Sequence, residues 1–198
     1  MAERPPRRVL ITGAATGAGL ALARALSVRG DTVLMVGRQA ERLRAAADEL
    51  GARAVPWNIT RDPETLLAIT APLDHLIHAA SRQAPAVDWA QADAEAVFAV
   101  GAIAPARLAR AFATQADPAV GPGVLFVVSP LARQAAPDQA LAAAAQAALL
   151  SLAGSLAGAL APVRVNALIA VEGAAVATLG LRALDDTTLT GKVLSPKP

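Results

Sequence analysis

A glycine-rich turn between an apolar run and a helix-like pattern constrains this chain more than any other stretch. The segment Val9–Leu26 begins with a short apolar run that ends at Thr12, and glycines follow at positions 13, 17 and 19. Glycine has no Cβ atom, so the backbone can turn sharply and approach a ligand closely. A helix starting at Gly17 would point unpaired N–H groups and its positive dipole end at the turn. The order of strand, turn and helix predicts a nucleotide-phosphate site, although a tight turn without a ligand has the same pattern.

Composition excludes several classes of site. The chain has no cysteine, so disulfides, thiolate chemistry and cysteine zinc sites are impossible, and we expect no metal site. The net charge is only +2, and no basic run is interleaved with aromatic residues, so we expect no nucleic-acid partner. The segment Met1–Arg8 lacks the apolar core of a signal peptide, which favours a cytoplasmic location. The 198 residues fit a single domain, 1–198, with a flexible tail at 1–7.

Apolar runs and helical patterns alternate along the whole chain. We expect strands at 9–12, 32–36, 52–57, 73–78, 123–129 and 163–169, with a small one around 192–194. We expect helices at 17–28, 41–50, 63–70, 87–112 and 138–160, with a kink at Gly101 and Pro105 and an irregular stretch from Glu172. Asp62 and Asp138 have the form of helix caps. Strict alternation with short connections indicates a parallel α/β sheet built from right-handed units.

The uncharged segment Leu141–Ala161 has an alternative interpretation as a membrane span. It is long enough, and Gly154 and Gly158 have the spacing of a membrane-helix dimer motif. However, the segment consists mainly of Ala, Gly and Ser and includes Gln146, a composition that drives insertion only weakly. We therefore expect a helix of the α/β fold and no membrane.

The residues around the glycine turn resemble the short-chain dehydrogenase/reductase family over nearly the whole chain. Thr12–Gly19 matches the family fingerprint Thr-Gly-x-x-x-Gly-x-Gly at every specified position. Asn58–Thr60 stands where the family has Asp-Val-Thr, and Asp74–Ser81 where it has a strand and Asn-Asn-Ala-Gly. Val163–Asn166 and Leu189–Leu194 look like its sixth and seventh strands. The resemblance implies a single Rossmann-like, doubly wound parallel sheet of order 3-2-1-4-5-6-7 with helices on both faces.

The resemblance also implies a dinucleotide site at the carboxyl ends of the strands. Its cofactor-binding residues would be Gly13, Ala15, Thr16, Gly17, Ala18, Gly19, Arg38, Asn58, Ile59, Ala79 and Ala80. A cofactor without the extra phosphate usually meets a carboxylate at the end of the second strand, where this chain has Gly37 and Arg38. A guanidinium suits a 2′-phosphate, which favours NADP(H) over NAD(H), although a solvated arginine at a strand end is the simpler alternative.

The family's reactive groups are mostly absent. The family uses a Tyr-x-x-x-Lys pair, a serine before it and an asparagine in the preceding helix. In this alignment Ala142 stands at the tyrosine position, Gln146 at the lysine position and Gly101 at the asparagine position. Ser129 stands at the serine position and is the only candidate catalytic residue; the chain contains no tyrosine at all. Neither a lone serine nor a glutamine is a general acid at neutral pH.

Two functions follow. The first is a family-like NADP(H)-binding protein without the Tyr, Lys and Asn groups, non-catalytic or acting through a partner. That partner would be a second copy or an active relative, bound through helices 87–112 and 138–160. The alternative is an atypical NADPH-dependent carbonyl reductase, or a non-redox enzyme that reuses the cofactor crevice. Residues 172–189 look like a truncated substrate-covering loop, which would exclude water poorly.

Overall fold

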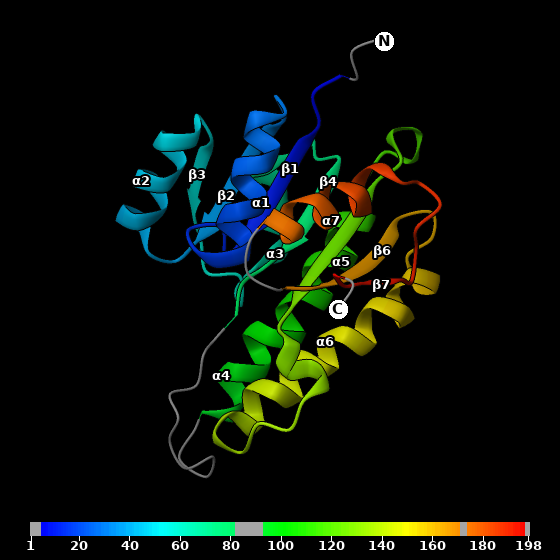
Figure 1. Cartoon of the computed structure of the whole chain (residues 1–198). Coiled ribbons are helices and arrows are strands. Elements are labelled where there is room, and N and C mark those ends of the chain that lie inside the picture. The colour runs from blue at the N-terminus through cyan, green and yellow to red at the C-terminus, as the bar shows by residue number, and fades with distance from the viewer. Residues whose placement is uncertain (1–4, 82–92, 171–173, 197–198) are drawn as a thin grey trace.

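Seven parallel strands form one sheet at the centre of the computed structural model, which describes residues 5–81, 93–170 and 174–196 (Figure 1). The strands are β1 (Arg8–Thr12), β2 (Thr32–Gly37), β3 (Arg53–Pro56), β4 (His75–His78), β5 (Gly123–Val128), β6 (Arg164–Ile169) and β7 (Val193–Leu194). Their order across the sheet is β3-β2-β1-β4-β5-β6-β7, with every neighbouring pair parallel. This confirms the predicted Rossmann-like strand order.

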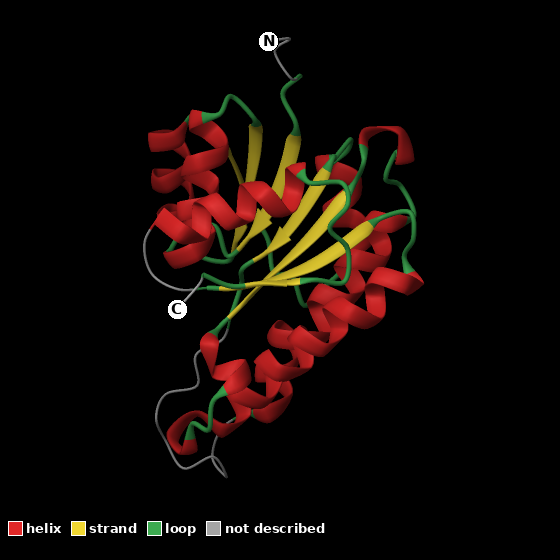
Figure 2. Cartoon of the chain, turned by 45° about the vertical axis from the view of Figure 1, so that its right-hand side comes forward, coloured by secondary structure: helices red, strands yellow, loops and turns green. Residues whose placement is uncertain are grey.

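Helices cover both faces of the sheet (Figures 1 and 2). One face carries α1 (Gly17–Val28), α2 (Ala40–Leu50) and α7 (Ala174–Asp185), and the other α3 (Pro63–Thr70), α5 (Ala104–Ala113) and α6 (Ala140–Ala159). In β1, Val9 and Ile11 join the core under α1, whereas Leu10 joins the core on the α5 side. Because both faces are covered, the inner strands are almost continuously apolar.

The helix expected over residues 87–112 is a compound element. Residues 87–92 lie outside the described part; the structure has α4 (Ala94–Phe98), a π-helical turn (Ala99–Ile103) and α5. Pro105 has no N–H to donate to the preceding turn, and a widened turn just before it accommodates that loss. The predicted irregularity near Gly101 and Pro105 is thus a π-helical turn.

The expectation of an irregular stretch from Glu172 was wrong. Ala174–Asp185 form α7, a helix of about three turns that packs against α1 (Figure 1). Its buried positions Val176, Gly180, Ala183 and Leu184 follow helical spacing. A Cβ atom at Gly180 would overlap Leu22 of α1, so glycine permits the close approach. The segment 172–189 therefore contains a helix that covers the sheet, and its interpretation as a truncated substrate-covering region stays a prediction.

The start of α6 also differs from the prediction. A 3₁₀ turn, Pro137–Gln139, precedes the helix, and Gln139 occupies the cap position without a side-chain cap bond, so Asp138 is not the cap. Asp62, in contrast, caps α3 as predicted, because its carboxylate accepts from the Thr65 N–H.

Two helices in the described part of the chain are long and apolar enough to cross a membrane, by length and composition only. They are Ala94–Ala113, of whose apolar window 56% is buried, and Pro137–Ala159, of whose window 28% is buried. Core helices of soluble proteins pass the same test, so this is weak evidence for a span. Most of the window in the second helix is not buried in the described fold, which leaves one side of this helix open to a partner.

Candidate cofactor site

The glycine turn is tied to both neighbouring strands. The Gly13 N–H donates to the Val36 carbonyl at 2.9 Å, and the Ala79 N–H donates to the Thr12 carbonyl at 3.0 Å. Gly13 has φ +70°, and a Cβ atom placed on it would lie 2.5 Å from the Ala80 nitrogen. Only glycine therefore fits at this point, where the turn packs directly on the end of β4.

The first turn of α1 leaves its N–H groups without a capping acceptor. Thr16, at the cap position, makes no side-chain cap bond, and the first turn contains no acidic residue. Gly17 has φ +53° and faces open space, whereas a Cβ atom on Gly19 would overlap the Gly13 carbonyl. Free N–H groups and the positive dipole end at a helix N-terminus suit a phosphate. The lack of a side-chain cap in the described part of the chain is the observation by which this turn fits a dinucleotide.

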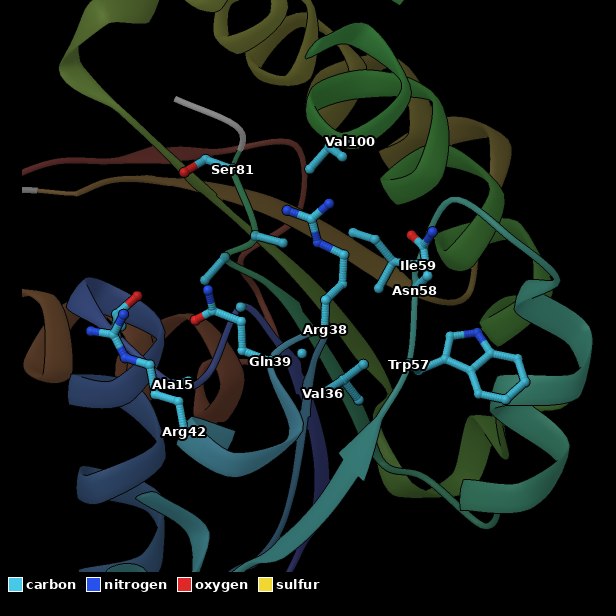
Figure 3. Close-up of a pocket in the computed structure, with 15 residues that line it drawn as sticks. Ala15, Val36, Arg38, Gln39, Arg42, Trp57, Asn58, Ile59, Ser81 and Val100 are labelled. Atoms are coloured by element: carbon cyan, nitrogen blue, oxygen red, sulfur yellow. The ribbon is translucent and has the colours of Figure 1, made fainter. Parts of the chain in front are cut away.

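A pocket of about 260 Å³ opens beside this turn, at the carboxyl ends of β1, β2, β3 and β4 (Figure 3). Of the predicted cofactor residues, it is lined by Gly13, Ala15, Thr16, Arg38, Asn58, Ile59, Ala79 and Ala80. The other three, Gly17, Ala18 and Gly19, belong to the first turn of α1 and do not line it. Gly37 and Ser81, which the sequence analysis expected near this crevice, also line it, and the lining residues that it missed are Val36, Gln39, Arg42, Trp57 and Val100.

Two guanidinium groups give this pocket its charge. Arg38 reaches across it toward Val100, whereas Arg42 lies beside Ala15 (Figure 3). No Asp or Glu is among the described residues that line the pocket, and neither arginine forms an ion pair within that part of the chain. Arg42 follows Arg38 by four residues and lies in the first turn of α2, so its closeness in the sequence could have revealed it.

The Asn58 side chain has a fixed orientation at the far end of the pocket. Its Oδ1 atom accepts from the Thr60 N–H at 3.1 Å and from the Thr60 hydroxyl at 2.9 Å. An N–H group can only donate, so the amide oxygen faces Thr60 and the amino group is left as a donor. Asn58 thus offers a hydrogen-bond donor where the family resemblance places adenine.

His78 lies beneath the turn rather than in the pocket. Its ring is fully buried, Nδ1 lies 2.9 Å from the Thr12 hydroxyl oxygen, and the ring meets Phe126 edge-on. Burial lowers the pKa of His78 to about 4, although the nearby backbone of Ala80 and Val100 partly opposes this shift. A neutral, buried imidazole is a packing group that links β1 to β4 and cannot serve as a proton donor at neutral pH.

A second cavity, of about 180 Å³, contains the residues that the sequence analysis aligned with the family's catalytic positions. It is lined by Ser81, Val97, Gly101, Ser129, Leu131, Gln139, Ala142, Ala145 and Gln146. The Ser129 N–H donates to Gln146 Oε1 at 2.7 Å, and the Ser129 hydroxyl accepts from the Leu131 N–H at 3.3 Å. None of these lining residues is an acid or a base at neutral pH. Ser81 lines both spaces, so the second cavity adjoins the cofactor pocket.

Fold and site together define the class of protein. Residues 7–185 match the family model of the short chain dehydrogenases, and the chain belongs to that family. The structure is similar to a short chain dehydrogenase from Mycobacterium smegmatis, with TM-score 0.86, 26% identity, and coverage of 98% of this chain and 92% of that one. It is also similar to the actinorhodin polyketide ketoreductase solved with NADPH, with TM-score 0.86, 18% identity, and coverage of 96% and 95%.

Curated relatives match over a shorter stretch. A protein of Streptomyces sp. (strain C5) named as a daunorubicin C-13 ketoreductase is 48% identical over 52 residues, which are 26% of this chain and 18% of that protein. An uncharacterised oxidoreductase of Mycobacterium tuberculosis is 39% identical over 56 residues, or 28% and 22% of the two chains. These matches thus span about a fifth of the curated relatives' length.

Proposed function

We propose that this family member binds NADP(H) but lacks the groups for the family's proton transfer, and that it acts without catalysis, through a protein partner. The observation that carries this proposal is the lining of the second cavity. Ala142 and Gln146 stand where the family has tyrosine and lysine, and the oxygen of Gln146 is engaged by the Ser129 N–H. Proton transfer needs a positioned group of suitable pKa, and the described lining offers none.

The preference for the phosphorylated cofactor rests on charge. Arg38 and Arg42 supply two guanidinium groups without a competing carboxylate in the described pocket lining, a setting that suits a 2′-phosphate. The first turn of α1 would hold the pyrophosphate, and the Asn58 amide would donate to adenine. NADPH would supply a hydride when bound, but the described lining of the second cavity offers no group to supply the proton. Similar structures were solved with NADPH, namely the actinorhodin ketoreductase and BdcA, which is consistent with this choice.

The partner is a second copy of the chain or an active relative, bound through helices 87–112 and 138–160. No charged residue stands between Asp138 and Arg164, yet α6 exposes a row of small side chains to solvent. Gly154 and Gly158 face open space, so nothing in the described fold requires glycine there. A glycine inside a helix costs about 1 kcal/mol relative to alanine, and close approach of another helix would explain its presence.

A second candidate function is an atypical NADPH-dependent carbonyl reductase. The observation that favours it is Ser129, which keeps its place at the end of β5 and lines a cavity adjoining the cofactor pocket. Positioning alone can lower a barrier substantially, with water then supplying the proton. A non-redox enzyme that reuses the same crevice is the third candidate function, and no group in the described lining favours it.

Calorimetric titration with NADP⁺, NADPH, NAD⁺ and NADH tests the cofactor proposal. We expect NADP(H) to bind at least about tenfold more tightly than NAD(H), a difference of about 1.4 kcal/mol. Arg38→Ala and Arg42→Ala should each weaken NADP⁺ binding and leave NAD⁺ binding unchanged. Arg44→Ala is the matched control, because Arg44 is exposed on the same helix and does not line the pocket. If neither dinucleotide binds, the glycine turn has only a structural role and the cofactor proposal fails.

A further inference from the structure

A further pocket, of about 270 Å³, lies between α7 and the strand β7, at the edge of the sheet opposite β3 (Figure 1). Leu179 and Arg182 line it from α7, and Lys192 and Leu194 line it from the β7 side. None of its described lining residues also lines the cofactor pocket or the second cavity. This edge pocket is therefore separate from both of those spaces.

Two cations from different elements give the edge pocket a positive charge. Arg182 belongs to α7, Lys192 directly precedes β7, and both residues are exposed. No Asp or Glu is among the described lining, and neither cation forms an ion pair within the described part of the chain. Two like charges that share a pocket without an acid favour an anionic ligand between them.

The two acids at the end of α7 are engaged elsewhere. Asp185 pairs with Arg29 at 2.7 Å. Asp186 accepts from the Thr188 N–H at 3.0 Å and from the Thr188 hydroxyl at 2.6 Å. These hydrogen bonds are the main cause that lowers the pKa of Asp186, and the charges of nearby arginines contribute less. Neither carboxylate lines the edge pocket, so the charge of its two cations is left for a ligand.

Both walls of the edge pocket are fastened to β6 by buried side chains of that strand. The Asn166 amide, with 1% of the residue exposed, donates to the Leu189 carbonyl at 2.8 Å and accepts from the Lys192 N–H at 3.0 Å. Arg164 donates to the Leu184 carbonyl at 2.7 Å and so holds the last turn of α7. A pocket whose walls are already fixed loses little conformational freedom when a ligand binds.

The remaining lining of the edge pocket is mainly apolar. Leu179, Leu189 and Leu194 contribute to it, and Val193 leaves 39% of its surface exposed. An inorganic anion would leave this apolar surface in water. An anion that carries an alkyl chain would cover it, which adds a hydrophobic contribution to the attraction between charges.

We propose that the edge pocket binds a small carboxylate with an apolar chain. Its two oxygens accept from the Arg182 guanidinium and the Lys192 ammonium, and its chain lies on the leucines and Val193. A guanidinium fork matches the geometry of a carboxylate. The volume is near the lower end of ordinary ligand pockets, about 300 Å³, so the ligand has few carbon atoms. This inference does not depend on the proposed function, because the edge pocket shares no lining residue with the cofactor pocket.

Hexanoate is a suitable probe, and its binding to the full ¹⁵N-labelled chain can be followed by NMR. We expect the backbone amide signals of Lys192 and Val193 to shift on titration. Hexan-1-ol keeps the chain without the charge, and acetate keeps the charge with almost no chain. Both compounds, and inorganic phosphate, should bind about fivefold more weakly than hexanoate or worse, because each lacks one of the two contributions.

Substitutions in the edge pocket test the assigned contacts. Arg182→Gln and Lys192→Gln should each weaken hexanoate binding about fivefold, the upper range for a charge pair open to solvent. Val193→Asp places a carboxylate beside both cations, so it should compete with hexanoate and abolish binding. All three positions are exposed, so the variants should remain folded. Arg53→Gln is the matched control, because Arg53 is exposed on β3 at the opposite edge of the sheet.

The outcomes separate this inference from the cofactor proposal. Equal hexanoate affinity of the native chain and both glutamine variants would overturn the inference, as would signal shifts confined to the cofactor pocket. Phosphate or hexan-1-ol binding as tightly as hexanoate would also overturn it, because the ligand would then lack either the chain or the charge. NADP⁺ affinity should be the same in Arg182→Gln and the native chain. A chain that binds hexanoate at this site but no dinucleotide would support the inference while the cofactor proposal fails.

Discussion

The Thr12 hydroxyl and His78 Nδ1 lie 2.9 Å apart beneath the glycine turn, and this contact joins β1 to β4 where the cofactor pocket opens. Both side chains are fully buried. His78 carries no charge in this environment, because burial lowers its pKa to about 4 from an ordinary 6.5. A neutral imidazole therefore packs beneath the glycine turn, and its protonation lowers the stability of the folded state.

Stability should depend on pH through His78. In the unfolded chain the imidazole takes up a proton near pH 6.5, but in the folded chain only near pH 4. The stabilisation is fully present above about pH 6.5 and is lost as the pH falls toward 4, by about 3 kcal/mol in total. Urea unfolding at a series of pH values should show this slope. His78→Asn removes the titration and leaves a polar partner for Thr12, so its profile should be flatter; parallel profiles would contradict the assignment.

Gly13 and Gly17 should respond differently to alanine. Gly13→Ala places a Cβ atom 2.5 Å from the Ala80 nitrogen at φ +70° and should cost at least about 2 kcal/mol. Gly17→Ala faces open space, so only the left-handed backbone costs about 1 kcal/mol, yet the methyl group obstructs a bound phosphate. We expect a folded protein with about tenfold weaker NADP⁺ binding.

Gly51→Ala is the matched control for Gly17→Ala. Gly51 has φ +62° and no neighbour within 4 Å of its would-be Cβ atom, but it ends α2 away from the pocket. Thermal unfolding should show the same loss of stability for both variants, and calorimetry should show weaker NADP⁺ binding only for Gly17→Ala. Equal affinities would mean that the turn does not hold the phosphates.

Restoring the family's reactive groups should create carbonyl reduction. The exchange needs Gly101→Asn, Ala142→Tyr and Gln146→Lys, and the structure adds a fourth change. A Cβ atom on Gly101 would lie 3.0 Å from the Ala145 Cβ atom, so Ala145→Gly must accompany the asparagine. We expect NADPH-dependent ketone reduction to rise by about 10²-fold or more in the fourfold variant, the usual range for proton-transfer groups. The threefold variant with Ala145 retained is its control and should be less active or less stable.

The exposed face of α6 should carry the self-association. Gly158→Arg introduces a charge where the side chain has open space, so the monomer should remain folded and at least as stable. Light scattering after size exclusion should show the native chain as an oligomer and this variant as a monomer. Val28→Arg places the same charge on an exposed apolar position of α1 and should leave the oligomer intact. A variant that still associates would overturn this interface, and a native chain that is monomeric would exclude a second copy as the partner and leave only an active relative.

Local signals in the sequence were sufficient for the parallel α/β class and the glycine turn. Apolar strand runs and the glycines at positions 13, 17 and 19 are short-range features, whereas the strand order across the sheet followed from the resemblance to the family. The π-helical turn beside Gly101 and the packing of Gly101 on Ala145 arise from contacts between distant segments, which composition does not reveal.

Other features had a signal that was overlooked. The helical spacing of Val176, Gly180 and Leu184 indicates α7, but the many small residues there concealed it. Arg42 follows Arg38 by four residues, in the first turn of α2, and could have been read as a second phosphate ligand. The contact of Gln146 Oε1 with the Ser129 N–H spans 17 residues and depends on how α6 packs against the end of β5, so no local pattern predicts it.

The most direct test of the central claim is the rate of NADPH oxidation by the native chain at saturating NADPH, with a small ketone such as cyclohexanone as acceptor. Cofactor fluorescence confirms that NADPH is bound, and its absorbance reports oxidation in the same sample. We predict a bound cofactor and no oxidation above the rate without protein. Turnover at an ordinary enzymatic rate, about 1 s⁻¹ or faster, would contradict the proposal that the proton-transfer groups have been lost.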